Sequence, residues 1–499
     1  MDSISLERMG IMSIHLARKI RLTLFLVGGG LALLAAASAA QGVIPEQCQT
    51  LIAQGDFTEA QALLRQRAAE PSLSEQARRQ LLFEAERLDR IRLDFSLPPD
   101  EMLAELKEDI PDVTLEDMTR WREQGALEGR MIDGQLFFFK RAKVNLFRLS
   151  AEARTRQVER PEAARPYSDR AIRIEDHMAR IIEASEKDDA RYVLPQRYRV
   201  QYTLRVKPDA VPAGETVRCW LLFPRERANQ KDIRWLASSP EKARIAPNSA
   251  LQRTVYLEQP AVGAKPTVFR IEYEVTTFAQ YEPVNPSQVK RYDTRSALYQ
   301  HHTAERPPHL AFTPELRALA KEIVGNETNP YLQAKKIFAW IDENITYTSA
   351  LEYSTIPNLS QYCAAGRRGD CGIQGLLFIA LCRISGVPAK WQSGWSLLPG
   401  RPGMHDWAEF YVVPYGWLPA DPSRGLRPVD DPDIHWFNFG NMDQFRLIGN
   451  DDYSAELVPP KQHFRSEPVD FQRGEVEWKG GNLYFDQWNY EIEVEHLNE

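Results

Sequence analysis

One segment constrains this chain more than any other: a glycine-rich polar stretch runs without a break into an apolar one. Residues 366–372 read Gly-Arg-Arg-Gly-Asp-Cys-Gly, and residues 373–382 are apolar apart from one glutamine. The apolar part is long enough for a buried helix, and Asp370 is a favourable N-cap residue for it. We therefore expect Cys371 in the first turn of a buried helix.

This position suits a nucleophilic cysteine. The helix dipole and the free N–H groups of a first turn favour a thiolate over a thiol. A thiolate is the nucleophile of acyl transfer, and the same N–H groups could hold a developing oxyanion. The neighbouring Asp370 carboxylate works partly against the thiolate. The alternative for Cys371 is a small core hydrophobe, which is the usual role of a lone buried cysteine.

A base and an orienting group follow downstream. Residues 405–413 read as a strand that begins with His405. A turn at residues 414–416 leads into a second short strand, which stops at Asp421 before a proline. A hairpin of that length brings Asp421 beside His405. We therefore expect Cys371, His405 and Asp421 to converge as nucleophile, base and orienting group.

Taken together, these motifs resemble the core of the transglutaminase-like superfamily. The family's Gly-Asp-Cys, Gly-[Val/Ile]-Pro-Ala, His-x-Trp-x-Glu and Asp-Pro-Ser motifs occur here in the family's order, at residues 369–371, 386–389, 405–409 and 421–423. The resemblance implies a papain-like α+β fold for the region that we place at residues 305–427. It also implies that Cys371, His405 and Asp421 match the family's catalytic triad one by one.

The remaining site residues are less clear from the sequence. The family's second oxyanion donor cannot be assigned, and Tyr347 and Gln361 are the upstream polar candidates. Trp407 is either a wall of the site or part of the core. His405 and Glu409 could share a metal, but no third histidine lies at ligand spacing, and no Asp-rich calcium loop is present. We therefore expect neither a cofactor nor a metal.

The other regions predict a multidomain α+β protein, since 499 residues correspond to about three or four domains. Helical periodicity predicts a helical region over residues 41–190, with a small winged-helix-like part that includes an Asp133-Gly134 hairpin signal. Period-two alternation predicts an Ig-like β-sandwich over residues 191–285. Residues 428–499 end in strands and are predicted as a C-terminal β-rich extension.

Residues 1–40 are expected to be a secretory signal peptide. Basic residues precede an apolar run from Leu22 to Ala37, and small residues follow it. This order is typical of a signal that is cleaved near Ala39 or Ala40. A retained membrane anchor is the alternative, although the run is short for a membrane span and contains a glycine triplet. We expect an exported protein, periplasmic or secreted.

Charge and cysteine content exclude several classes of protein. With 62 basic and 69 acidic residues the net charge is -7, so we expect no nucleic-acid partner. Five cysteines are too few for a disulfide scaffold. The four cysteines other than Cys371 allow three pairings, of which Cys363 with Cys382 is the nearest in sequence. Simple buried thiols are the alternative.

Three functions fit these residues. In the first, Cys371 forms a thioester with an acyl group taken from an amide, and water completes the cycle, as in a peptidase or amidase. In the second, an amine completes it, which makes a cross-linking transamidase. In the third, the core is a catalytically silent binding module. We favour hydrolysis of a peptide or protein, with cell-wall peptide as one candidate, and we expect membrane contact only if the N-terminal segment is retained.

Overall fold

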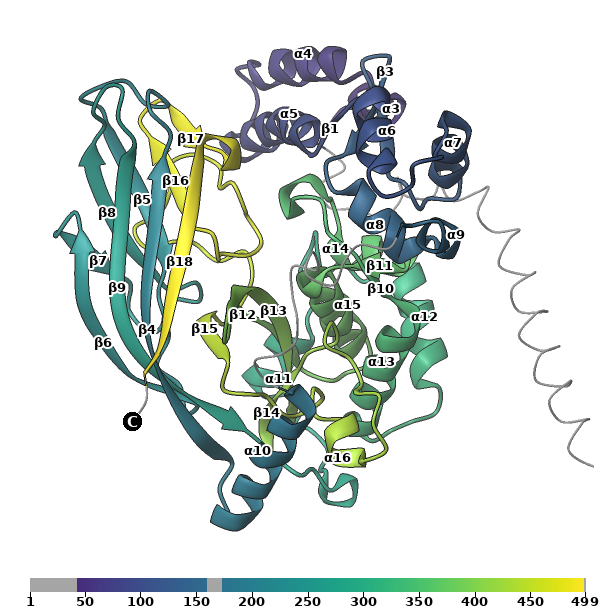
Figure 1. Ribbon diagram of the computed structural model, residues 1–499, viewed down its shortest axis with the longest axis vertical. Helices are drawn as coiled ribbons and strands as arrows, with labels where there is room; N and C mark the ends of the chain where they lie inside the picture. The colour runs from purple at the N-terminus through teal and green to yellow at the C-terminus, as the bar shows by residue number, and fades with distance from the viewer. Residues whose placement is uncertain (1–42, 159–172, 498–499) are drawn as a thin grey trace, which may run out of the picture.

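The computed structural model describes residues 43–158 and 173–497, which form an N-terminal helical part, a β-sandwich and a central α+β core (Figure 1). The signal peptide expected over residues 1–40 lies outside the described residues. Within the described ranges, no helix combines the length and the apolar character that crossing a membrane requires.

The N-terminal part packs amphipathic helices around a hydrophobic core of its own. Helix α5 begins after Ser74, whose hydroxyl accepts a backbone hydrogen bond, and α7 begins with a reciprocal Thr114–Asp117 capping box. Strands β2 and β3 are joined by Asp133 and Gly134, both at positive φ, which is the hairpin that the sequence predicts. The elements are α3 (Glu46–Gln54), α4 (Phe57–Ala68), α5 (Glu75–Asp94), β1 (Phe95–Leu97), α6 (Pro99–Lys107), α7 (Leu115–Glu123), β2 (Gly129–Ile132), β3 (Gln135–Phe139), α8 (Ala142–Leu149) and α9 (Ala151–Thr155), followed by α10 (Ile174–Asp188), which packs apart from this core.

The β-sandwich draws its strands from two distant parts of the chain. One sheet has the order β17-β16-β5-β8-β7 and the other has the order β18-β4-β9-β6. In Figure 1 the C-terminal strand β18 lies along β4. The strands are β4 (Tyr192–Val206), β5 (Thr216–Leu222), β6 (Gln230–Ser239), β7 (Ala243–Ile245), β8 (Thr254–Pro260), β9 (Thr267–Gln280), β16 (Glu475–Trp478), β17 (Gly481–Leu483) and β18 (Trp488–Leu497), with a short turn η4 (Phe485–Gln487) before the last.

This pairing corrects the prediction of a separate C-terminal extension over residues 428–499. Strand β16 pairs with β5, and β18 pairs with β4 along its whole length. Without them, β4 and β5 would each leave an edge of unpaired backbone groups, which is a costly feature for a sheet. The last strands therefore complete the sandwich that the sequence predicts over residues 191–285.

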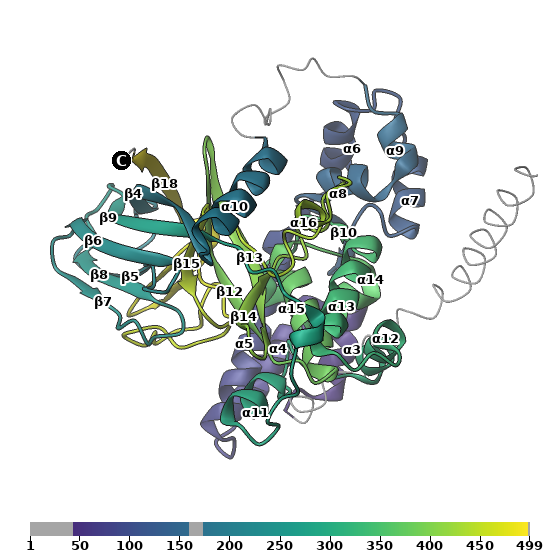
Figure 2. The same cartoon turned by 90° about the horizontal axis from the view of Figure 1, so that it is seen from below.

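The central core is an antiparallel sheet of order β14-β13-β12-β15 with the buried helix α15 against one face (Figure 2). Its last strand, β15, comes from beyond residue 427, where the sequence predicted the core to end. The elements are α11 (Ala297–Thr303), α12 (Pro314–Val324), α13 (Pro330–Asn344), β10 (Thr346–Tyr347), α14 (Leu359–Gly366), β11 (Arg368–Gly369), α15 (Cys371–Ile384), β12 (Ala389–Leu398), β13 (Arg401–Val412), β14 (Gly416–Ala420), α16 (Pro432–His435) and β15 (Arg446–Asn450), with short turns η2 (Pro286–Gln288) and η3 (Tyr353–Thr355).

The close pairing of β12 with β15 depends on Gly394. A Cβ atom at this position would lie 1.9 Å from the backbone oxygen of Leu447, whereas a Cβ at Gly403 on β13 would meet nothing within 4 Å. We expect Gly394→Ala to lower the free energy of unfolding by about 1–3 kcal/mol, because the strands must separate to admit the methyl group. Gly403→Ala is the matched control and should stay within about 0.5 kcal/mol of the parent protein in urea unfolding. Equal stability of the two variants would contradict this account.

Candidate active site

The site is built on the start of helix α15. Cys371 is the first residue of the helix, and the carboxylate of Asp370 caps it by accepting a hydrogen bond from the Ile373 N–H at 3.1 Å. Both features confirm the prediction from the sequence. The cysteine is nearly covered, with 9% of its surface exposed.

The thiol of Cys371 contacts a carboxyl group that the sequence did not single out. Its sulfur lies 3.2 Å from Oδ2 of Asp406, to which the thiol donates. The other oxygen of Asp406 accepts a hydrogen bond from Gln472 at 2.8 Å. The Tyr353 hydroxyl donates to Asp370 at 2.8 Å and lies 3.4 Å from Oδ2 of Asp406. The thiol therefore belongs to a buried network of two carboxyl groups and a phenol.

His405 and Asp421 form a second pair, as the sequence predicts. Nε2 of His405 lies 2.6 Å from Oδ2 of Asp421, and Arg446 donates to the same oxygen at 2.7 Å. The other oxygen of Asp421 accepts hydrogen bonds from the Ser423 hydroxyl and the Arg424 backbone N–H. The β13–β14 hairpin makes this pairing, and the carboxylate holds the imidazole in one orientation.

Asp406, which contacts the thiol, and His405 lie on opposite faces of strand β13, because successive side chains of a strand alternate. Asp406 is on the same face as Ala408 and Phe410, which pack in the core cluster that includes α15. His405 points the other way. Within the described ranges no hydrogen bond joins Cys371 to His405. His405 and Asp421 therefore pair as expected, but Cys371 does not join them and contacts Asp406 instead.

The electrostatics of the thiol also correct an expectation. Burial raises the pKa of Cys371 well above its ordinary value of 9.0, and the negative charges of Asp406 and Asp370 raise it further. The helix N-terminus was expected to favour the thiolate. Desolvation and two neighbouring carboxyl groups outweigh it, so the thiol is protonated in this arrangement.

The surrounding groups are shifted in ways that follow from burial. Burial raises the pKa of Asp370 to about 6 and raises that of Asp406 well above its ordinary value, with nearby carboxylates adding to the effect on Asp406. Burial lowers the pKa of His405, against the opposing charge of Asp421. Burial also disfavours ionised Asp421, but His405 and Arg446 overcome this and hold its pKa below the ordinary range. Asp421 is therefore a carboxylate, and His405 is neutral near pH 7.

The three further candidates have different surroundings. Tyr347 lies opposite Gly369 in the β10–β11 pair, two residues before Cys371. Gln361 accepts a hydrogen bond from Thr313 at 2.7 Å, which is a contact between two helix starts. Trp407 is fully buried on the His405 face, with ring centres 5.7 Å apart. Of the three, Tyr347 is the one that backbone pairing places beside the residues leading into Cys371.

Sequence reasoning missed Asp406, Tyr353, Gln472 and Arg446. For Asp406 the sequence contained a signal. Side chains alternate between the two faces of a strand, so if His405 lies on one face, Asp406 lies on the other. No local pattern marks the other three, which come from elements far apart in the chain.

The other cysteines take no part in the site. All five cysteines lie in the described residues as buried free thiols, so Cys363 and Cys382 are not paired. Within the described ranges no group of three or more histidine, cysteine, aspartate or glutamate side chains could hold a metal ion.

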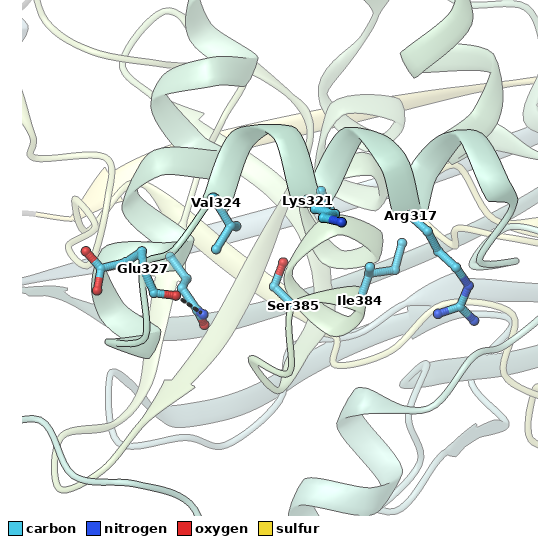
Figure 3. Close-up of a pocket in the computed structure, with 9 residues that line it drawn as sticks. Arg317, Lys321, Val324, Glu327, Ile384 and Ser385 are labelled. Carbon is cyan, nitrogen blue, oxygen red and sulfur yellow. Dashed lines mark hydrogen bonds between the residues drawn. The ribbon is translucent and has the colours of Figure 1, made fainter.

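A cavity at the opposite end of α15 is separate from the thiol. Arg317, Lys321 and Val324 of α12 line it together with Ile384 and Ser385 (Figure 3). Cys371 and Ile384 are the two ends of a helix, which at 1.5 Å per residue places them about 20 Å apart. This cavity therefore does not serve chemistry at Cys371.

Comparison with known proteins identifies the fold around the thiol. Residues 317–422 match the family model of the transglutaminase-like superfamily. The protein carries a transglutaminase-like core. The match lies within the range predicted from the sequence and contains Cys371, His405 and Asp421.

Three further proteins are similar to parts of this chain. An uncharacterized protein of Haemophilus influenzae is 25% identical over 185 residues, which cover 30% of this chain and 50% of that protein. The match therefore spans half the length of that relative. A crystal structure from Cytophaga hutchinsonii, provisionally named a cysteine protease, is 17% identical with a TM-score of 0.41 and covers 62% of this chain and 93% of that one. The periplasmic domain of TgpA from Pseudomonas aeruginosa is 16% identical with a TM-score of 0.24 and covers 52% and 97%.

The contact between Cys371 and Asp406 predicts how the thiol alkylates. We expect iodoacetamide to modify Cys371 with a midpoint above pH 9, because burial and two carboxyl groups disfavour the thiolate. In Asp406→Asn the midpoint should fall by about one unit, which is roughly a tenfold faster reaction at pH 8. Peptide mapping by mass spectrometry separates Cys371 from the four other thiols, and Cys371→Ser is the control. A midpoint that does not move would contradict a direct interaction between the two side chains.

Proposed function

We propose that this protein is an exported transglutaminase-like cysteine hydrolase that cleaves amide bonds of peptides or proteins through a thioester on Cys371. The observation that carries the proposal is the nucleophile's position, because Cys371 opens a buried, capped helix inside the region that matches the family. Free backbone N–H groups at that helix start suit the oxyanion of a tetrahedral intermediate.

The chemistry follows from these groups. The sulfur attacks the carbonyl carbon while the thiol proton passes to a base, and the π electron pair of the C=O bond moves onto the oxygen. The C–N bond then breaks as the base returns the proton to the departing amine, which leaves a thioester on Cys371. Water attacks the thioester in the second half, and the sulfur leaves and is protonated again.

We assign the proton transfer to His405, held by Asp421. Their 2.6 Å contact fixes the imidazole, and Arg446 keeps the carboxylate ionised. A neutral imidazole is the form that can accept a proton. Because His405 and the thiol lie on opposite faces of β13, this assignment requires the core to rearrange when substrate binds, so that the thiol leaves Asp406 and approaches His405.

Asp406 is a second candidate for the base, favoured by its 3.2 Å contact with the sulfur. Its role would replace that of His405 in the same sequence of bond changes. The raised pKa of the thiol argues against this role. Burial raises the pKa of Asp406 as well as that of Cys371, so burial does not favour transfer of the thiol proton to Asp406.

Two substitutions separate these candidates. If His405 is the base, His405→Asn should lower kcat/KM by about 10²–10⁴-fold, as expected for loss of a general base. Asp421→Asn should lower it as well, whereas Asp406→Asn should retain most activity. The measurement is peptide hydrolysis followed by mass spectrometry, with circular dichroism to verify folding. The reverse pattern would assign the proton transfer to Asp406 and overturn the assignment of the triad.

The acyl acceptor distinguishes a hydrolase from a transamidase. We expect hydrolysis to exceed incorporation of a labelled primary amine into a peptide substrate, and an acid-quenched reaction should show an acyl-enzyme mass that hydroxylamine removes. Cys371→Ala should abolish both. Faster amine incorporation than hydrolysis would identify a cross-linking transamidase, and no adduct at Cys371 with any peptide would identify a silent binding module.

Export is part of the proposal and rests on the order of basic, apolar and small residues at the N-terminus. Sequencing of the mature protein should find its first residue near position 40. An intact Met1 would contradict cleavage.

A further inference from the structure

Tyr347 forms an exposed wall beside the nucleophile. Strand β10 pairs in parallel with β11, and this pairing sets Tyr347 opposite Gly369, two residues before Cys371. Tyr347 keeps 43% of its surface exposed, whereas Gly369 and Cys371 are buried. Tyr347 is therefore an exposed ring on the strand pair that leads into Cys371.

The N-terminal part supplies a fixed cation over the same ring. Asn145 of α8 is buried and makes two hydrogen bonds with the backbone of Ser349, at 2.8 Å and 2.7 Å. Arg148 lies three residues further along α8, which is the same face of the helix. Its guanidinium carbon lies 5.2 Å from the centre of the Tyr347 ring. Figure 1 shows α8 beside β10 and β11.

Arg148 differs from the arginines that tie the N-terminal part together. Arg87 is paired with Glu84, and Arg120 and Arg156 are both paired with Asp117. Across residues 43–158 and 173–497, Arg148 forms no ion pair, and its side chain is exposed. A guanidinium stacked on an aromatic face keeps its edge N–H groups free, in the fork that binds a carboxylate.

We propose that Arg148 and Tyr347 bind a carboxylate of the substrate close to the scissile amide, so that the enzyme prefers acidic peptides. The inference rests on the proposed function, since it needs Cys371 as the nucleophile. Arg148 is an exposed cation that forms no ion pair within residues 43–158 and 173–497, so it can pair with an anionic group of the substrate. The carboxylate is either an acidic side chain or a free C-terminus of the peptide.

Paired probes test this recognition. Peptidyl acyloxymethyl ketones that differ only by Glu or Gln beside the reactive group label Cys371, and mass spectrometry gives the second-order rate constants. A second pair differs only by a free or amidated C-terminus, which distinguishes the two sources of the carboxylate. We expect the parent protein to react with one acidic probe about 5–50-fold faster than with its neutral partner, as for a charge-assisted contact that is partly exposed to solvent.

Substitutions then locate the preference. Arg148→Gln should bring the ratio of acidic to neutral probe close to one by slowing the reaction of the acidic probe, and Arg148→Lys should retain part of the preference. Arg154→Gln removes the same charge from neighbouring helix α9 and should leave the ratio as it was. Equal labelling by both probes in the parent protein, or a ratio that Arg148→Gln does not change, would overturn the recognition and leave the proposed function standing. No labelling of Cys371 by any probe, while iodoacetamide still reacts with it, would overturn both.

Discussion

The contact between the first turn of α15 and strand β13 is the constraint on which the site depends. It fixes the sulfur of Cys371 at 3.2 Å from Asp406, and it is maintained from behind by Gln472, which donates to Asp406 and to the backbone oxygens of His405 and Gly394. Because the helix is buried from Cys371 to Arg383, the sulfur cannot shift without a rearrangement of the core. The protonation state of the nucleophile is thus determined by the same packing that positions it.

The segment between α13 and α14 connects this core to the N-terminal part. Asn145 holds Ser349, Asp94 accepts a hydrogen bond from the Glu352 backbone, and Arg87 donates to Thr355. These contacts come from two helices of the N-terminal part, α5 and α8, and fix the segment that carries Tyr347 and Tyr353. The N-terminal helices, for which the sequence indicates no chemistry, therefore form part of the surroundings of the nucleophile.

The sequence predicted those features that depend on neighbours along the chain. The capped helix at Cys371, the hairpin that pairs His405 with Asp421, and the turn at Asp133 all follow from local patterns, and the structure has them. The pairing of β18 with β4 and of β16 with β5 joins residues more than 200 positions apart, and no local pattern records it.

The same difference between local patterns and long-range packing applies to the site. Residue types and spacing indicated which groups carry chemistry, but not which face of β13 meets the thiol. The pKa of Cys371 followed the burial of its surroundings and the two carboxyl groups, and burial depends on the packing of the whole core. A first turn of a helix was therefore insufficient to predict a thiolate.

The order of strands in the sandwich has a consequence for biogenesis. The transglutaminase-like core lies in sequence between β9 and β16, so it is an insertion between two halves of one sandwich. The first half leaves β5 and β4 with open edges until strands β16 and β18 have been synthesised. Closure consequently waits for synthesis of β16 and β18, and until then the growing polypeptide carries exposed strand edges, a condition that favours association with a chaperone.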